Sequence, residues 1–568
     1  MKITFIKIYN YRNLDGLEVN FNKDINFIVG ENNIGKSNFQ DCIFRVLSGK
    51  SFLKEDFSDD TKKIKIEMTF CLNTDEIGIF DDLVDPKDRS AININAIQDD
   101  CEEYIKFYHK ESNELIPNNI IKKINVIAYD SLRNPKNEID FSKTKGAGAF
   151  LNYLIEKYVK SYSEKGVINQ SEISKVRDYV SSSLKKLTAF NRFGIKPEVD
   201  VDEGVILSKI LVLKDENNID VPNNGYGVQF NILIMLSLLE KIIKFDKKSK
   251  GSDTEFSTLL LFDEPEIHMH PYLQRTIIKD IMQIASGKDE CFNELLEEHF
   301  GIKKVSAQII ITTHSPNMLN NDYKKIIRMY KKNNNTLAVS CADLKLKNNE
   351  QKQLLMQFEY IKESVFAKTA IVVEGDSEFG SFRLFGEKCD VDFDRCGISL
   401  IKAGGADSVI PIIKLFNQLG IKAVGVIDND KRIEKKLPDE EYLFYTSSKC
   451  FDSEIVKKII SKENFYILEE ILQSYDSRGK DRCIQKEKLN EIINKFNYKN
   501  LEADNSYRFK DIDTKNPLYE IMYVSWFAIN KGVLLGKVIG SMLNIENIPD
   551  CYVNAINKVK EFAEESGR

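Results

Sequence analysis

Alternating apolar and polar residues near the start of the chain predict a β-strand at ITFIKIY (3–9), and KIKIEMTF (63–70) shows the same two-residue period. Continuous apolar runs are typical of strands that are buried on both faces. They occur at INFIV (25–29), TLLLF (258–262) and QIIIT (308–312), and INVIAY (124–129) is also expected to be a strand. The strands therefore indicate an α/β protein whose most apolar strands lie inside a sheet.

Between the strands, the spacing of apolar residues changes to three and four, which predicts helices. One helix is expected to open at Lys36, a second covers about 148–190, and a long apolar helix covers about 228–244. The apolar residues on one face of the second segment are Ile173, Val176, Val180, Leu184 and Leu187. The segment is therefore either an amphipathic helix that packs on the core or a dimerisation insert. A polar turn, KKNNNT (331–336), is expected to join two short strands.

The length of 568 residues exceeds the size of a single hydrophobic core, so two or three domains are expected. A separate α/β unit begins at TAIVVEGDSE (369–378), which places the boundary near 345–365. With 42% hydrophobic and 30% charged residues, the composition is that of a soluble globular protein. No apolar run approaches the ~20 residues that a membrane span needs, so no membrane association is expected.

Net charge and cysteine usage further narrow the class of protein to which this chain can belong. The formal net charge is −6, so any contact with nucleic acid would need a local basic patch, and Arg and Lys near 432–436 are candidates. The ten cysteines are scattered without a CxxC pair, which argues against a zinc knuckle and against a disulfide framework. Reduced thiols in a cytoplasmic protein are the simplest interpretation.

The segment GENNIGKS (30–37) fits the phosphate-binding pattern G-x-x-x-x-G-K-S and lies between a predicted strand and a predicted helix. Backbone N–H groups at a helix start can face phosphate, and Gly30 and Gly35 keep that backbone accessible. Lys36 is expected to reach the β- and γ-phosphates of ATP, and Ser37 to offer its hydroxyl to Mg²⁺.

A second apolar strand supplies the acidic part of such a site. LLLFDEPEIH (259–268) ends in Asp263, which is expected to hold the same Mg²⁺, and Glu264, which is expected to polarise the attacking water. His314, in TTHSP (312–316), would bond the γ-phosphate or that water; the alternative is a loop histidine that bonds nearby backbone. His268 and His270 are expected to stabilise the turn into the next helix.

Four carboxylates are expected to converge at strand ends in the later unit. Two of them follow an apolar strand in IVVEGDSE (371–378), four residues apart, and two follow another in VGVIDND (424–430), two residues apart. They are Glu374, Glu378, Asp428 and Asp430. Such a cluster would repel itself unless cations bind, and oxygen-only ligands suit Mg²⁺ or Mn²⁺. Two ions would stabilise the attacking and leaving oxygens of phosphodiester cleavage.

NYRNL (10–14), GENNIGKS, DEPE and TTHS together resemble the ABC-type ATPase head of SMC, RecF-like and OLD-family proteins. The resemblance implies that ATP lies between two heads, so that a signature loop of one head contacts the γ-phosphate held by the other. NNGYGVQ (223–229) is the candidate loop through Gly225, Gly227 and Gln229, although Asn224 stands where such heads usually have Ser. A glycine turn at a helix start is the alternative. The resemblance also implies nucleotide contacts by Arg12, Asn32, Asn33 and Asn38.

The order E-G-x-x-E, Gly404-Gly405, D-x-D resembles the TOPRIM fold, and the order of motifs along the whole chain resembles OLD-family nucleases. That resemblance implies a second metal at Asp452 and Glu454 and a late lysine that neutralises charge, either Lys531 or Lys537. It implies an ABC-type ATPase head at 1–145 and 201–350, a helical dimerisation insert at 146–200, and a TOPRIM nuclease domain with a helical extension at 351–568.

The function implied is a nucleotide-regulated, Mg²⁺- or Mn²⁺-dependent DNA endonuclease that acts in anti-phage defence. A homodimer or homotetramer is expected, with a helicase-like partner if the chain is of the Gabija type or a reverse transcriptase system in other relatives. Two alternatives stay open: an ATP-dependent DNA clamp or sensor without cleavage, and a TOPRIM strand-passage enzyme or primase. Long heptad arms are absent, which disfavours the clamp.

Overall fold

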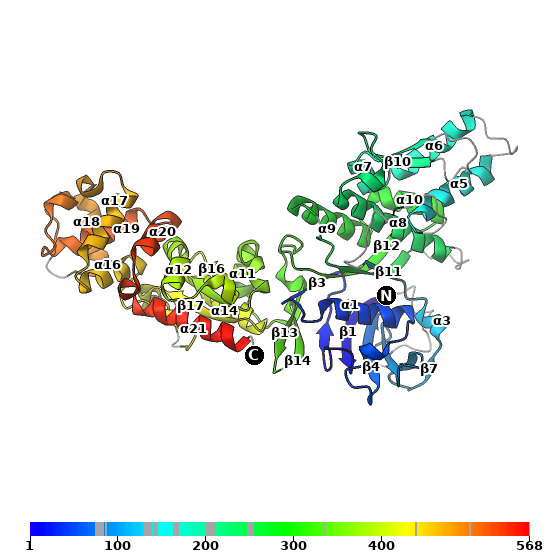
Figure 1. Cartoon of the computed structure of the whole chain (residues 1–568), viewed down its shortest axis with the longest axis horizontal. Helices are drawn as coiled ribbons and strands as arrows, with labels where there is room; N and C mark the ends of the chain where they lie inside the picture. Colours follow the sequence, from blue (N-terminus) through cyan, green and yellow to red (C-terminus); the bar gives the residue numbers. More distant parts are fainter. Residues whose placement is uncertain are drawn as a thin grey trace. The chain divides into compact units, whose positions relative to one another are not determined.

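The computed structural model describes residues 1–73, 85, 88–129, 139, 146–162, 170–199, 211–246, 255–267, 269–333, 335–437, 440–498 and 501–566. The chain forms two compact units, drawn in Figure 1. The first contains Met1–Tyr330 and Asn335–Ala342, and the second contains Lys331–Asn334 and Asp343–Arg568.

The first unit begins with an antiparallel sheet. Its strands, in spatial order, are β2 (Glu18–Asn20), β1 (Lys2–Tyr9), β4 (Ile64–Cys71), β5 (Ala91–Gln98), β6 (Lys106–His109) and β7 (Leu115–Ile116). Strand β1 buries Ile3, Ile6 and Ile8, and a shift in its register with β4 between Ile3 and Phe5 interrupts the predicted two-residue alternation. A short helix, α3 (Asn118–Ile121), follows β7.

A second sheet carries the most apolar strands of the chain. Its order is β14 (Asn335–Ser340), β13 (Ile326–Lys332), β3 (Ile25–Gly30), β12 (Lys304–Thr312), β11 (Glu255–Asp263) and β8 (Val126–Tyr129), and the pairings from β13 to β8 are parallel. Helix α1 (Lys36–Ser48) shares a hydrophobic core with both sheets, and α9 (Pro271–Ala285) and α10 (Glu290–Phe300) also pack on β12. Cover on both faces explains why every residue of β3 is buried.

A group of helices completes the first unit (Figure 1). It consists of α5 (Gly148–Tyr162), α6 (Gln170–Leu184), α7 (Thr188–Arg192) and α8 (Tyr226–Asp246), with the strand pair β9 (Lys196–Val199) and β10 (Leu211–Lys214). The predicted apolar face is confirmed as a buried face at Val176, Val180, Leu184 and Leu187. The side chain of Ile173 lies outside the described residues. So do residues 204–210 of GVILSKILVL (204–213), a segment whose sequence also predicts a strand and whose last residues form part of β10. The dimerisation role stays a prediction.

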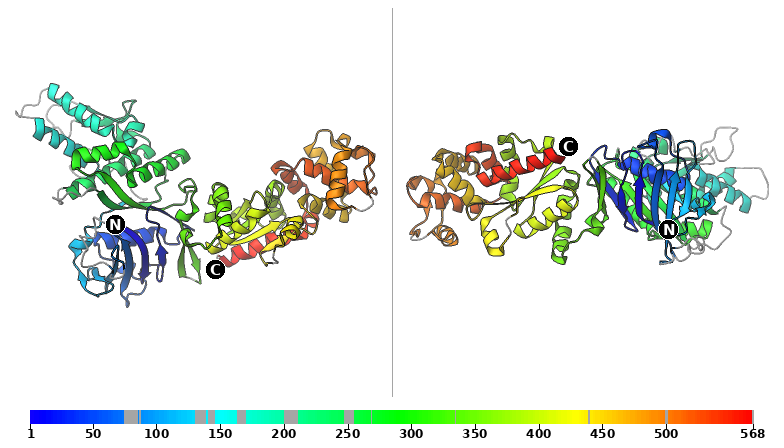
Figure 2. Two further views of the ribbon diagram at one scale, coloured as in Figure 1. Left: turned by 180° about the vertical axis from the view of Figure 1, so that it is seen from behind. Right: turned by 90° about the horizontal axis from the view of Figure 1, so that it is seen from below.

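The second unit contains a four-stranded parallel sheet in the order β16 (Ile398–Lys402), β15 (Thr369–Val373), β17 (Lys422–Ile427), β18 (Leu443–Tyr445). Its surrounding helices are α11 (Asn348–Ile361), α12 (Asp376–Lys388), α13 (Phe393–Cys396), α14 (Ala406–Gln418), α15 (Asn429–Lys435) and α21 (Asp550–Ser566). Figure 2 shows α14 and the C-terminal helix α21 on opposite faces of this sheet.

The helical extension after β18 belongs to the same core as the parallel sheet. It consists of α16 (Phe451–Ser461), α17 (Phe465–Tyr475), α18 (Lys486–Phe496), α19 (Leu518–Ile529), α20 (Val533–Met542), and the strand pair β19 (Cys483–Ile484) and β20 (Tyr507–Arg508). The single tryptophan, Trp526, is fully buried in this core, so its fluorescence reports on the folding of the second unit. In the described part of the chain, no helix combines the length and the apolar character that a membrane span requires.

Candidate functional site

The loop between β3 and α1 is shaped by two glycines with positive φ. A Cβ on Gly30 (φ 153°) would lie 2.3 Å from the Met329 carbonyl oxygen, and one on Gly35 (φ 104°) would lie 2.8 Å from the Asn13 side chain. Glycine is therefore required at both positions of the predicted phosphate cradle. Lys36 Nζ donates to the carbonyl oxygens of Gly30 (3.1 Å) and Glu31 (2.9 Å), so the ammonium is held beneath the loop.

An open pocket of about 850 Å³ lies against this loop. Its lining residues are Asn32, Asn33, Gly35, Lys36, Ser37, Asn38, Glu264 and His314, all of which the sequence predicts as nucleotide contacts. Ser37 Oγ donates to Asp263 Oδ1 (3.1 Å), which brings together the two predicted Mg²⁺ ligands from α1 and β11. The loop between β3 and α1, called the P-loop below, and the acidic end of β11 thus form one site at the carboxyl edge of the parallel sheet.

Glu264 and His314 face each other across this edge, with His314 Nε2 3.3 Å from Glu264 Oε1. Burial, and then the charge of Lys36, lowers the pKa of His314, so the ring is neutral near pH 7. Glu266 fixes the loop: its Oε1 accepts from Thr313 Oγ1 and from the His314 N–H, both at 2.7 Å. Glu266 is the last residue of the DEPE segment, and its side-chain contacts could not be predicted from that position alone.

Arg12 lies in a network with acidic residues that sequence reasoning missed. Its guanidinium donates to Asp56 Oδ1 (2.7 Å), Asp41 Oδ2 (2.9 Å) and Asn38 Oδ1 (2.6 Å). Arg12 also lines a second cavity of about 500 Å³ together with Ser37 and Asp263. This places Arg12 beside the nucleotide pocket, and its direct contact with nucleotide stays a prediction.

In the candidate signature loop, Gln229 is buried and donates to the carbonyl oxygens of Pro222 (2.9 Å) and Asn224 (2.7 Å). A Cβ on Gly227 would lie 2.1 Å from Leu273 Cδ2, whereas one on Gly225 would meet open space. These contacts fit the glycine turn at the start of α8, and the signature role stays a prediction.

The turn before α9 fits the structural role expected of its histidines. His270 occupies the N-cap position of α9, and its side chain accepts from the Tyr272 N–H at 3.4 Å. The ring also stacks on Tyr272, with centroids 5.7 Å apart. His270 therefore fixes the start of the helix. His268 lies outside the described residues.

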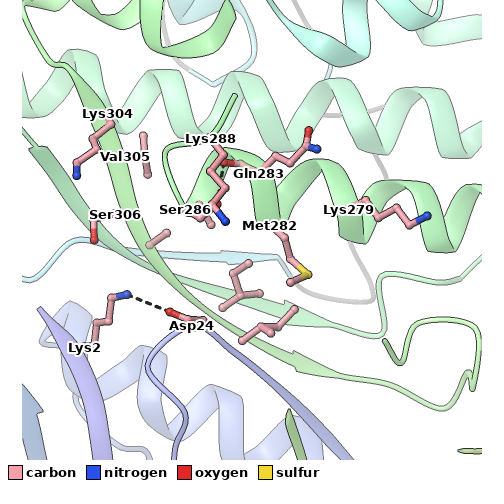
Figure 3. Close-up of a pocket in the computed structure, with 14 residues that line it drawn as sticks. Lys2, Asp24, Lys279, Met282, Gln283, Ser286, Lys288, Lys304, Val305 and Ser306 are labelled. Carbon is pink, nitrogen blue, oxygen red and sulfur yellow. Dashed lines mark hydrogen bonds and ion pairs between the residues drawn. The ribbon is translucent and has the colours of Figure 1, made fainter. Parts of the chain in front are cut away.

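Another pocket in the first unit, of about 580 Å³, is shown in Figure 3. Lys2 points toward Asp24 there (Nζ to Oδ1 3.5 Å), and Lys304, which is paired with Glu255 at 2.6 Å, opens strand β12. The pocket therefore lies where parallel strands begin, at the edge opposite the P-loop. The ion pairs with Asp24 and Glu255 offset part of the positive charge of the lysines that line the pocket.

In the second unit, the predicted carboxylates follow the ends of two adjacent parallel strands. Glu374 directly follows β15, and Glu378 is in the first turn of α12. Asp428 follows β17 as the N-cap residue of α15, and Asp430 is in the first turn of that helix. Glu374 Oε2 accepts from the Asp428 N–H (3.2 Å), and Asp428 Oδ1 accepts from the Phe451 N–H (2.9 Å), which ties both strands to α16.

The oxygen donors of this acidic centre, also called the acidic edge, fit a divalent cation; its residues are Glu374, Glu378, Asp428, Asp430 and Asp452. Among the described residues, Glu378 Oε2, Asp430 Oδ1 and Asp452 Oδ1 are buried oxygens without a hydrogen-bond partner. Burial is the main cause that raises the pKa values of Glu374, Glu378, Asp428 and Asp452. No three His, Cys, Asp or Glu side chains of the described residues already meet as a metal-binding group. The fit therefore rests on the unsatisfied carboxylate oxygens.

Lys531 supplies the positive charge at this centre, with Nζ 4.0 Å from Asp452 Oδ2. Burial disfavours its charge, but the carboxylates of Asp452, Glu378 and Asp428 outweigh that effect and raise the pKa of Lys531. Lys531 and the alternative late lysine, Lys537, are both exposed, and the ion pair with Asp452 distinguishes Lys531. Both carboxylate oxygens of Glu454 have a contact: Oε2 accepts from the Ser448 N–H (2.5 Å), and Oε1 faces the Cys551 thiol (3.9 Å).

Close packing of α12 and α20 holds Lys531 in place. A Cβ on Gly380 would lie 2.2 Å from the Val533 carbonyl oxygen, and one on Gly536 would lie 2.1 Å from the Ser377 carbonyl oxygen. Between these contacts, Gly532 N–H donates to Ser377 Oγ at 3.2 Å. The glycines therefore set the position of the loop that carries Lys531, a feature that single-sequence spacing did not reveal.

These features define the class of protein: a P-loop ATPase unit of the ABC/SMC-head type, joined to a TOPRIM-type unit with a carboxylate edge. The AAA ATPase domain family matches residues 1–144 and 84–319, more than half of the chain, so the chain belongs to that family. The overcoming lysogenization defect protein-like TOPRIM domain family matches residues 365–430. Together they confirm the fold class and the OLD-type arrangement expected from the sequence. ATPase and TOPRIM domains generally use a nucleotide and a divalent metal ion.

Among curated relatives, the Endonuclease GajA of Bacillus cereus (strain HuB5-5) is 25% identical over 451 residues, which cover 73% of this chain and 62% of GajA. The Old nuclease of Escherichia phage P2 is 22% identical over 513 residues, which cover 82% of this chain and 83% of that protein. A solved Smc head bound to the C-winged helix domain of ScpA aligns with 60% of this chain and 98% of its own at 14% identity and a TM-score of 0.38. The chain thus spans less than two thirds of GajA.

The pKa of Lys36 leads to a prediction for nucleotide binding. Burial lowers that pKa to about 8, whereas phosphate contact would restore the charged form. ATP affinity is therefore expected to fall as pH rises above 8, by roughly tenfold at pH 9 relative to pH 7, with uptake of a proton on binding. Calorimetric titrations at pH 7, 8 and 9 in buffers of different ionisation enthalpy measure both effects. Equal affinity at all three pH values without proton uptake would contradict the prediction.

Proposed function

We propose that this chain is a nucleotide-regulated, divalent-metal-dependent DNA endonuclease. The observation that carries the proposal is the acidic edge of the second unit, where carboxylate oxygens of Glu378, Asp430 and Asp452 are buried without a hydrogen-bond partner and Lys531 lies 4.0 Å from Asp452 Oδ2. The same chain also has a P-loop site. The names of the relatives, an endonuclease and a nuclease, support the same activity. We further propose a role in anti-phage defence, on the likeness to GajA and to the Septu protein PtuA of Bacillus thuringiensis, which is 24% identical over 328 residues.

At the acidic edge, Glu374, Glu378, Asp428, Asp430 and Asp452 would hold Mg²⁺ or Mn²⁺, with Glu454 as a further candidate. When bound, the metal supplies Lewis-acid stabilisation of the charge that develops on the phosphate. Glu378 or a ligand-bound water would take the proton from the attacking water; burial raises the pKa of Glu378 to about 7, which suits a general base near neutral pH. Lys531 faces the scissile phosphate and offsets its negative charge in the transition state.

In the first unit, Lys36 and Ser37 would bind the phosphates and Mg²⁺ of ATP, with Asp263 on the same ion. Glu264 orients the hydrolytic water, and the neutral His314 bonds that water or the γ-phosphate. Two heads would enclose ATP as a homodimer or as part of a homotetramer, and Gly225, Gly227 and Gln229 of one head would approach the nucleotide of the other. A helicase-like protein or a reverse transcriptase system is the proposed class of partner.

Supercoiled plasmid tests the proposal. The wild-type chain is expected to nick or linearise it with Mn²⁺ or Mg²⁺, and nucleotide is expected to change the rate. Glu374→Gln is expected to lower the rate by at least about 100-fold, because Glu374 is a proposed metal ligand next to Asp428.

The control for this assay is Asp394→Asn, which changes an exposed acid of the same unit that pairs with Arg383. It should cut at the wild-type rate. Equal cleavage by wild type and Glu374→Gln would end the proposal. ATP-dependent DNA binding without cleavage under either metal would favour the clamp or sensor.

A further inference from the structure

Lys449 and Lys495, called the lysine pair below, are two cationic side chains that the proposed chemistry does not use. Lys449 Nζ donates to the backbone carbonyl oxygen of Lys495 at 2.6 Å, which joins the segment before α16 to the end of α18. No carboxylate of the described residues forms an ion pair with either ammonium. Because an ammonium has three N–H donors, two donors of Lys449 and those of Lys495 are available for a ligand.

An aromatic ring holds both ammonium groups in one place. Lys449 Nζ lies 5.7 Å and Lys495 Nζ lies 5.8 Å from the centroid of the Phe496 ring. Both distances fall within the range of a cation–π contact, about 6 Å. Lys449 and Phe496 are half-buried, and Lys495 is exposed. The lysine pair is therefore restrained on the side of the protein and accessible from solvent.

Hydrogen bonds of the backbone place the lysine pair beside the acidic centre. The Asp430 N–H donates to the Lys449 carbonyl oxygen at 3.1 Å, so the segment that carries Lys449 is bonded to the start of α15. The next element is α16, with Asp452 in its first turn. Burial raises the pKa of Asp452, and the charges of Lys531 and then Lys495 oppose that rise, which agrees with this placement.

The basic residues near 432–436, which the sequence indicates as candidates for DNA contact, have contacts of their own. Lys435 pairs with Asp407, and the Arg432 guanidinium lies over the Tyr445 ring, 4.5 Å from its centroid. An ion pair offsets the charge of Lys435, whereas no carboxylate of the described residues pairs with the lysine pair. The lysine pair is thus the better placed source of positive charge beside the acidic centre.

We propose that the lysine pair binds the phosphodiester backbone of DNA beside the acidic centre, at a phosphate that flanks the scissile one. The inference deepens the proposed function and rests on it, because it takes DNA as the substrate of that centre. Contacts to phosphate position a duplex and carry no sequence information, so this contact is independent of sequence. Local positive charge of this kind is what a chain with a net charge of −6 needs in order to bind a polyanion.

The test compares Lys449→Gln/Lys495→Gln with Lys480→Gln/Lys510→Gln. The second variant is the matched control, because it removes two exposed charges from the same helical extension, and each of its lysines is paired with a carboxylate. Binding of a labelled DNA duplex to the full chain is followed by fluorescence anisotropy over a range of KCl concentrations, with Ca²⁺ in place of Mg²⁺.

The salt dependence gives the sharpest readout. Each lysine–phosphate contact contributes about 0.9 to the slope of log affinity against log salt concentration, so Lys449→Gln/Lys495→Gln is expected to reduce that slope by about 2. Its affinity at about 50 mM KCl should fall roughly 10-fold or more, and equally for duplexes of different sequence. The control variant should bind as wild type does. Unfolding followed by Trp526 fluorescence should give similar midpoints for all three proteins.

Lys495→Gln alone keeps the bond from Lys449 to the backbone, so it tests the inference without disturbing the segment before α16. It is expected to reduce the salt slope by about 1. Salt slopes equal to that of wild type, an equal loss in the control, a loss confined to one duplex sequence, or a wild-type chain that binds no duplex would overturn the inference. Failure of the proposed function is distinguishable: a wild-type chain that binds the duplex but never cleaves it with Mg²⁺ or Mn²⁺ refutes the nuclease and leaves the comparison of salt slopes intact.

Discussion

Replacing Lys531 by methionine is expected to slow DNA cleavage by about 10²- to 10³-fold, the usual loss when a preorganised charge at a transition state is removed. The ammonium lies 4.0 Å from Asp452 Oδ2, and its charged form is favoured by three carboxylates. Mn²⁺ affinity should stay the same or increase, because the substitution removes a positive charge from the metal-binding region. Single-turnover cleavage at saturating Mn²⁺, together with a metal titration, separates the two effects.

Lys537→Met provides the matched control, since it removes the same charge from the same segment at an exposed position. That variant is expected to cleave at the wild-type rate. A similar loss of rate in both variants would assign the effect to general electrostatics or DNA affinity. A loss of cleavage rate confined to Lys537→Met would show that Lys537, and not Lys531, acts as the late lysine.

The two lysines of the candidate sites illustrate how the environment sets the charge state. Lys36 is held by backbone carbonyls beneath the P-loop, and burial lowers its pKa. Lys531 faces carboxylates, and their charge raises its pKa despite burial. The first lysine therefore gains its full charge when an anion binds, whereas the second is already a permanent counter-charge.

Local sequence patterns were sufficient to place the candidate site residues at strand ends. The apolar runs that end at Gly30 and Asp263 were readable because strands buried on both faces are continuously apolar, and the same holds for the strands before Glu374 and Asp428. Since parallel strands end at one edge of a sheet, the contacts between Ser37 and Asp263 and between Glu374 and Asp428 followed from topology.

Other parts of the sites depend on contacts between distant segments. Gly380 and Gly536 meet across two helices, and Lys449 reaches the Lys495 carbonyl oxygen at the end of α18. No spacing within one segment encodes such a contact, so a single sequence gave no signal for it. Strand β5 is a different case: AININAIQ alternates as regularly as β1, and that signal was present but not used.

Gly380→Val is expected to displace the Lys531 loop and to abolish cleavage. The added Cβ would lie 2.2 Å from the Val533 carbonyl oxygen, so α12 and α20 must separate. Overpacking of this kind costs about 3 kcal/mol. For a unit of this size, that cost lowers the unfolding midpoint, followed by Trp526 fluorescence, by roughly 6 to 12 °C. ATP binding by the first unit should be unchanged.

Gly532→Ala is the control in the same segment, because a Cβ there would meet only the Asn530 carbonyl oxygen, at 3.9 Å, an ordinary contact. Its φ of 163° is extended backbone that alanine adopts without strain. This variant should unfold and cleave as wild type does. If Gly380→Val instead kept both the wild-type midpoint and the wild-type cleavage rate, the close packing of α12 and α20 would not be what positions Lys531.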